Sequence, residues 1–179
     1  MLTPLHTPDW SPFITLPGTQ HAPPPRALGS PGGLGDRLRA VAFAECQARE
    51  AFKWAAQRFA NLPEPLPQGL ESAWMGLSLA EDRHFSWLMH RMEELKIDPR
   101  ERPVSLRLWE SYMNCQSAAE FSLYMASVEE RGCIVGERFY CILIDSDLVT
   151  VEIFKKIVDE EIEYIALAYR FFPDLPKPR

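Results

Sequence analysis

Residues 78–95 read SLAEDRHFSWLMHRMEEL, and this stretch decides the fold class of the chain. Apolar side chains recur in it at steps of three and four, which is the spacing of one buried face of an α-helix. Glu81 and His84 stand on that same face, three residues apart. Because residues at i and i+3 are neighbours on a helix, this carboxylate and this imidazole can reach one metal ion together.

Three further segments show the same helical periodicity, and each carries an acid on its apolar face. Glu45 lies on this face in the first segment, which we expect to begin near Asp36. Glu129 lies on it in a segment that starts at Leu108, and Glu161 lies on it in the last segment. The sequence therefore predicts four long helices, each of which turns at least one carboxylate inward.

Glycine, proline and aspartate interrupt the helical pattern between these segments. The interruptions fall at residues 61–69, 96–105, 131–136 and 145–147, and they leave a short extra helix before the last long helix. Strand signals are few, the best being CILI at 141–144. We therefore predict an all-α, bundle-like protein with no sheet of three or more strands.

One helical domain is expected over residues 36–173, because 179 residues with 46% hydrophobic content can cover a sizeable core. Residues 1–35 are rich in proline and glycine, which predicts an extended N-terminal arm that lies on this domain. Residues 174–179 are expected to form a C-terminal tail.

The amino-acid composition limits which kinds of ligand or surface we expect this protein to bind. The formal net charge of −6 does not support a nucleic acid as the main ligand. No apolar run approaches the ~18 residues of a membrane span, and the N-terminus lacks a signal-peptide pattern, so we expect a cytoplasmic protein that does not bind membranes. The four cysteines form no Cys-x-x-Cys pair, which favours reduced thiols that fill core space.

Four inward carboxylates would repel one another in a dry core unless a cation lay among them. The four-helix solution to this problem uses one Glu from each of two helices and a Glu-x-x-His motif from each of the other two, around two metal ions. Glu45 and Glu129 fit the single-glutamate roles, and Glu81 with His84 fits one Glu-x-x-His motif. The fourth helix offers Glu161 to the same site.

The second Glu-x-x-His motif is incomplete, because Tyr164 stands three residues after Glu161. A phenolate binds ferric iron, whereas a neutral phenol is a poor ligand, so we expect the second metal position to be weakened, modified or vacant. Glu160 and Glu163 offer an alternative pair of ligands, which would make the second metal site all-carboxylate. We prefer Glu161 with Tyr164, because this choice keeps the apolar residues of the helix on the same inward face. Tyr164 then acts as a ligand, a radical donor or a hydrogen-bonding partner of bound oxygen, or it only packs.

The chain resembles an uncharacterised bacterial family of ferritin-like proteins, a domain-of-unknown-function group, over about residues 24–173. The resemblance implies a ferritin-like four-helix bundle with a metal site at Glu45, Glu81, His84, Glu129 and Glu161. The family usually has histidine where this chain has Tyr164. Five stretches carry the resemblance: RALGSP (26–31), AECQARE (44–50), AEDRHF (80–85), VEERG (128–132) and EEIEYIALAYRFF (160–172).

These residues predict a non-haem di-iron or iron–manganese carboxylate protein that activates dioxygen or peroxide and oxidises a small-molecule substrate. One alternative is a metal-binding or storage protein without an organic substrate. Another is a bundle whose degenerate site serves as a binding scaffold. A homodimer is compatible with each of these functions.

Overall fold

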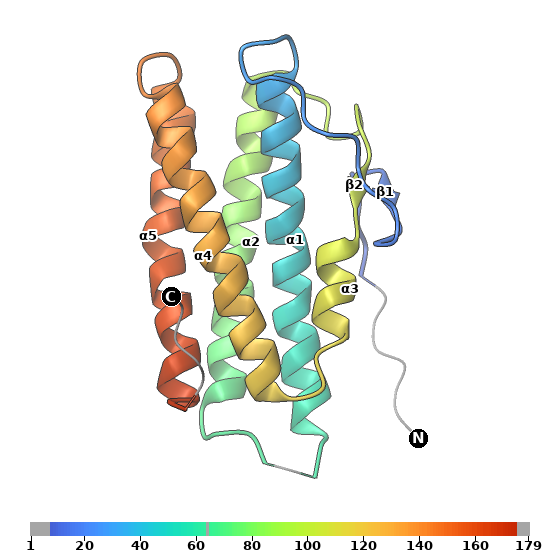
Figure 1. Cartoon of the computed structure of the whole chain (residues 1–179), viewed down its shortest axis with the longest axis vertical. Helices are drawn as coiled ribbons and strands as arrows, with labels where there is room; N and C mark the ends of the chain where they lie inside the picture. The colour runs from blue at the N-terminus through green and yellow to red at the C-terminus, as the bar shows by residue number, and fades with distance from the viewer. Residues whose placement is uncertain (1–7, 64, 175–179) are drawn as a thin grey trace. The chain divides into compact units, whose positions relative to one another are not determined.

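A computed structural model of the protein describes residues 8–63 and 65–174 (Figure 1). The first seven residues of the predicted arm and residues 175–179 of the predicted tail lie outside the described residues. Helices dominate the described part of the chain, which has no sheet of more than two strands, so the prediction of an all-α fold is confirmed. In chain order the elements are β1 (Thr15–Leu16), α1 (Gly33–Ala60), α2 (Leu70–Glu94), β2 (Val104–Ser105), α3 (Arg107–Met113), α4 (Ala118–Leu143) and α5 (Leu148–Phe171).

The helices divide into two compact units. The first unit holds β1, α1, β2, α3 and all of α2 except its first residue, and it ends at Asn114. The second unit holds α4 and α5 and includes the loop before α2. The arrangement of four long helices in a single ferritin-like bundle stays a prediction.

Helix α1 begins at Gly33, three residues before the predicted start at Asp36. Glycine is required on both sides of this boundary. Gly32 has a φ of 79°, in the left-handed region, and a Cβ on Gly33 would lie 2.0 Å from the carbonyl oxygen of Ala27. The glycines that suggested an extended arm therefore also form the tight entry into the helix.

The described part of the predicted arm contacts the rest of the first unit through a strand and two aromatic side chains. β1 pairs with β2 in a parallel two-stranded sheet. Trp10 and Phe13 pack on Phe43 of α1, with ring centroids 5.7 and 5.0 Å from it. Phe13 also lies 6.2 Å from Phe85 of α2, so the arm contacts both long helices of this unit.

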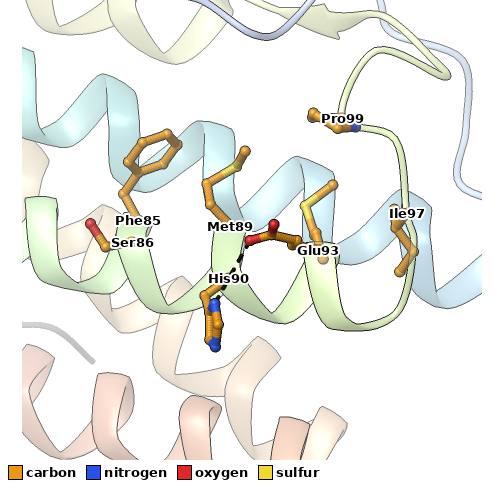
Figure 2. A pocket seen from close by; sticks show the side chains of 8 residues that line it. Phe85, Ser86, Met89, His90, Glu93, Ile97 and Pro99 are labelled. Carbon is orange, nitrogen blue, oxygen red and sulfur yellow. Dashed lines mark ion pairs between the residues drawn. The ribbon is translucent and has the colours of Figure 1, made fainter.

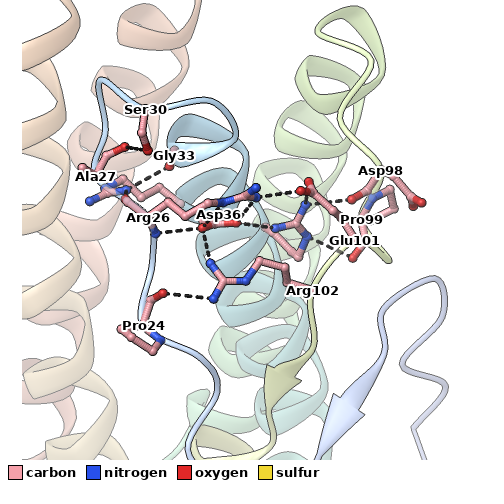
Figure 3. Close-up of polar contacts among 12 residues, drawn as sticks. Pro24, Arg26, Ala27, Ser30, Gly33, Asp36, Asp98, Pro99, Glu101 and Arg102 are labelled. Atoms are coloured by element: carbon pink, nitrogen blue, oxygen red, sulfur yellow. Dashed lines mark hydrogen bonds and ion pairs between the residues drawn. The ribbon is translucent and has the colours of Figure 1, made fainter.

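A buried carboxylate, Asp36, ties the arm to α1 and to the segment before β2 (Figure 3). It accepts hydrogen bonds from the guanidinium groups of Arg26, Arg39 and Arg102. The bond from Arg26 is the main cause that holds the pKa of Asp36 far below its ordinary value. Glu101 accepts further bonds from Arg26 and Arg39, so charge-assisted bonds connect the whole cluster.

The second unit is a hairpin in which α4 and α5 pack along each other (Figure 1). Asp147 caps α5 by accepting a hydrogen bond from the backbone nitrogen of Thr150 at 3.1 Å. Between the two helices, Phe139 stacks on Phe154 with ring centroids 4.7 Å apart. The predicted interruption at residues 145–147 is therefore a capped turn between antiparallel helices.

Two predicted helix boundaries are wrong. The helix expected over residues 108–129 is broken after Met113, because Ser117 caps a new helix by accepting a bond from the backbone nitrogen of Glu120. The interruption expected at 131–136 does not exist, since α4 runs through it to Leu143. The short helix therefore precedes α4 and not, as predicted, the last long helix.

Among the residues that the structure describes, no helix has the length and apolar character needed to cross a membrane.

Candidate metal centre

Three polar side chains meet between α1 and α2 inside the first unit. Glu45 comes from α1, and Glu81 and His84 come from α2. One ligand atom of each lies within 4.8 Å of the others. His84 Nδ1 is 3.5 Å from a carboxylate oxygen of Glu45 and 3.8 Å from one of Glu81. The structure thus brings together three of the five metal ligands predicted from the sequence.

All three side chains of this Glu–Glu–His cluster are buried, with relative exposures of 6% for Glu45, 1% for Glu81 and 0% for His84. The apolar face that carries Glu81 and His84 also includes the buried Trp74 and Leu88. Burial of two carboxylates side by side is costly unless positive charge lies close to them. A bound metal cation would supply that charge.

Two hydrogen bonds next to the cluster hold α1 and α2 in register. Ser78 Oγ donates to the carbonyl oxygen of Arg49 at 3.0 Å, and the Arg49 guanidinium donates to Asp82 at 2.7 Å. Arg49 lies one turn after Glu45, and Ser78 lies one turn before Glu81. These contacts join residues far apart in the sequence, which is why the helical pattern alone did not reveal them.

The donor set consists of two carboxylates and one imidazole. Such oxygen and nitrogen ligands suit divalent iron, manganese or zinc better than copper(I), which prefers sulfur.

The thiol of Cys46, which follows Glu45 in the chain, receives a weak hydrogen bond from Arg49 at 3.6 Å. Burial raises the pKa of this thiol to about 11, so Cys46 stays protonated at neutral pH. The imidazole ring of His84 is flanked by Trp87, 5.5 Å away between ring centroids.

The other predicted site residues lie in the second unit, where Glu129, Glu161 and Tyr164 are all buried. On α5 the structure buries Glu161, whereas the two acids of the alternative register are half-buried (Glu160) and exposed (Glu163). A role for Glu129, Glu161 and Tyr164 alongside the Glu–Glu–His cluster stays a prediction.

Cys133 is a neighbour of Glu161 that the sequence pattern did not predict. The Cys133 thiol lies 3.5 Å from a Glu161 carboxylate oxygen and donates to it. Burial, with a further contribution from Glu161, raises the pKa of Cys133 to about 12. One feature of the sequence could have indicated this neighbour. Cys133 follows Glu129 by four residues, so the two side chains share one side of α4.

The second histidine of α2, His90, is exposed and does not belong to the cluster. Figure 2 shows its side chain beside Glu93. Its side chain is 73% exposed, and its ring nitrogens are 3.9 Å from Glu93 and 3.4 Å from Glu94. Together with Phe85 and Met89 it lines a shallow cavity of about 520 Å³. This exposed histidine of the same helix provides a matched control for His84.

Fold and site define a helical protein with a buried Glu–Glu–His cluster between two helices of one unit. The family model described as protein of unknown function (DUF455) matches residues 3–178, so the chain belongs to this uncharacterised family. The comparison with curated proteins finds no match. The comparison with solved structures finds none either. Membership of an uncharacterised domain family is confirmed, and the ferritin-like class of that family stays a prediction.

Proposed function

We propose that this protein is a metal-dependent oxidoreductase of the non-haem type, and that Glu45, Glu81 and His84 hold its metal ion. The observation that supports this function is the buried cluster itself, whose ligand atoms lie within 4.8 Å of one another. Structural metal sites usually close the coordination shell with four protein ligands, whereas catalytic sites keep a position open. A cluster of three protein ligands therefore favours a catalytic metal site over a purely structural one.

The chain's own residues set the conditions for this chemistry. Iron or manganese would supply one-electron exchange with dioxygen or peroxide when bound. Glu45 and Glu81 contribute negative charge, which favours the higher oxidation states of such an ion. The near-complete burial of all three ligands keeps bulk water away from them.

The two-ion form of the proposal adds Glu129 and Glu161 as ligands, with Tyr164 beside the second ion. Under this form the protein binds two ions per chain, and Glu129→Gln lowers the stoichiometry from two to one. With the Glu–Glu–His cluster alone, the protein binds one ion per chain and Glu129→Gln changes nothing.

Metal content tests the site directly. The full chain is loaded with ferrous iron without oxygen, separated from free metal, and analysed by mass spectrometry. We expect at least one ion per chain in the wild type. Glu81→Gln and His84→Gln should bind the metal at least about 10- to 100-fold more weakly, since loss of a ligand should cost no less than loss of a residue that only orients one. The control, His90→Gln, changes an exposed histidine of the same helix and should keep the wild-type content. If His84→Gln and His90→Gln have the same metal content, His84 is not a metal ligand and the proposed site is wrong.

Oxygen uptake by the iron-loaded protein tests the reaction class. We expect the wild type and His90→Gln to consume dioxygen when a reductant is present, and Glu81→Gln to lose most of this uptake. A protein that binds iron at the cluster but takes up no dioxygen or peroxide is a metal-binding or storage protein, and the oxidoreductase proposal is then wrong.

A further inference from the structure

The α4–α5 hairpin carries a groove of about 430 Å³, which belongs entirely to the second unit. Tyr140 and Cys141 of α4 and Val158 of α5 line it together with charged side chains of both helices. Tyr140 is 46% exposed, so its aromatic ring is available to a partner at this groove.

Two exposed apolar residues of α5 lie on the same side of the helix as Lys155, one before the groove and one after it. Leu148, Lys155 and Ile162 follow one another at intervals of seven residues, so they share one side of the helix. Lys155 lines the groove, and Leu148 and Ile162 are 61% and 55% exposed. Large apolar residues at heptad spacing on an exposed face are typical of a helix that packs against another helix. Leu148 and Ile162 thus leave apolar surface exposed on the side of α5 that carries Lys155.

The charges around the groove are compatible with a second copy of the chain as its occupant. Glu137 and Asp159 contribute negative charge to its lining, and Lys155 contributes positive charge. A surface that carries both signs can pair with itself across a two-fold axis, because the lysine of one copy meets an acid of the other. A groove of one sign would repel a second copy.

We propose that the α4–α5 hairpin of a second copy of this chain fills the groove, so that the protein is a homodimer through this surface. Two helical hairpins then pack face to face as four helices around the exposed apolar line. This inference is independent of the metal-site proposal, since none of its residues belongs to the Glu–Glu–His cluster.

Sedimentation equilibrium of the full chain tests the dimer. At tens of micromolar we expect twice the chain mass of 20.5 kDa for the wild type. Lys155→Glu places three acids around each groove and should weaken the dimer at least tenfold. Lys156→Glu makes the same charge change at the next exposed position, outside the groove lining, and should leave the dimer intact. Reversal of all three charges together (Lys155→Glu, Glu137→Lys and Asp159→Lys) should restore it.

An apolar pair of variants provides a second test. Leu148→Asp and Val149→Asp both place an acid in the first turn of α5, where the helix dipole tolerates it, so both should fold. Only Leu148 lies on the heptad line, and only Leu148→Asp should produce monomers. A monomeric wild type overturns the proposal. Equal effects of the two Asp variants, or of the two lysine variants, also overturn it.

Discussion

Asp36 shows what a single buried charge does in this protein. Its carboxylate joins the arm residue Arg26, the helix residue Arg39 and the loop residue Arg102. Removal of one partner from a buried charge network leaves the others unpaired and is more costly than the loss of one surface ion pair. The connection of the arm to the first unit therefore depends strongly on this one residue.

We predict that Asp36→Asn lowers the free energy of unfolding by about 3 kcal/mol at pH 7, because the neutral amide cannot pair with three guanidinium groups. The folded pKa of Asp36 lies below its ordinary value of 3.8. The stabilisation is therefore fully present above about pH 4 and decreases as the pH falls further. Urea denaturation of both proteins at pH 7 and at pH 3 measures the difference.

The exposed Asp145 provides the control, and Asp145→Asn should change stability by less than about 0.5 kcal/mol. A gap between wild type and Asp36→Asn that stays constant or widens between pH 7 and pH 3 would show that the charge of Asp36 is not the cause.

At the scale of the elements, two glycines allow α4 and α5 to approach closely. A Cβ on Gly132 would lie 3.1 Å from a Glu161 carboxylate oxygen. A Cβ on Gly136 would lie 2.4 Å from Cγ2 of Val158, closer than two carbon atoms can pack. These glycines sit inside a continuous helix, where glycine is ordinarily unfavourable, because the partner helix occupies the space of a side chain.

We predict that Gly136→Ala destabilises the hairpin by about 1–3 kcal/mol through this clash, although alanine is the better helix former. Val158→Ala should rescue the variant, since the remaining Val158 Cβ lies 3.9 Å from the new methyl group. Gly76→Ala is the control: nothing lies within 4 Å of that position, and the change should stabilise α2 by up to about 1 kcal/mol. Thermal unfolding compares the four proteins, and Gly136→Ala at or above wild-type stability contradicts the account.

The same glycines explain which helices could be predicted from the sequence. Apolar periodicity is a local signal, and it located α1, α2 and α5 within a few residues. Gly132 and Gly136 were interpreted as a helix break because a sequence does not show which partner a glycine accommodates. The pairing of β1 with β2 also depends on residues far apart in the chain, and two-residue strands have no pattern of their own.

The candidate site was predictable to a similar extent. The i, i+3 spacing places Glu81 beside His84 on any helix, and the apolar stripe of α1 orients Glu45 inward. The hydrogen bonds of Ser78 and Arg49 hold α1 and α2 in the register that brings the three ligands together. No local sequence pattern indicates these bonds. The contact of Cys133 with Glu161 likewise requires the packing of α4 on α5.

At the scale of the whole molecule, the Glu–Glu–His cluster needs only one of the two units. Glu45, Glu81 and His84 come from α1 and α2 of the first unit, and the groove that we assign to dimerisation lies in the second. Metal binding and dimerisation can therefore be removed separately. Each variant that tests one of them should leave the other unchanged.

Anomalous X-ray scattering from crystals of the manganese- or iron-loaded full chain tests the central claim most directly. We predict an anomalous peak at bonding distance, about 2.0–2.3 Å, from His84 Nδ1 and from carboxylate oxygens of Glu45 and Glu81. The same peak should vanish in crystals of Glu81→Gln and persist in His90→Gln. A metal-loaded crystal in which no peak contacts Glu45, Glu81 or His84 would contradict the account.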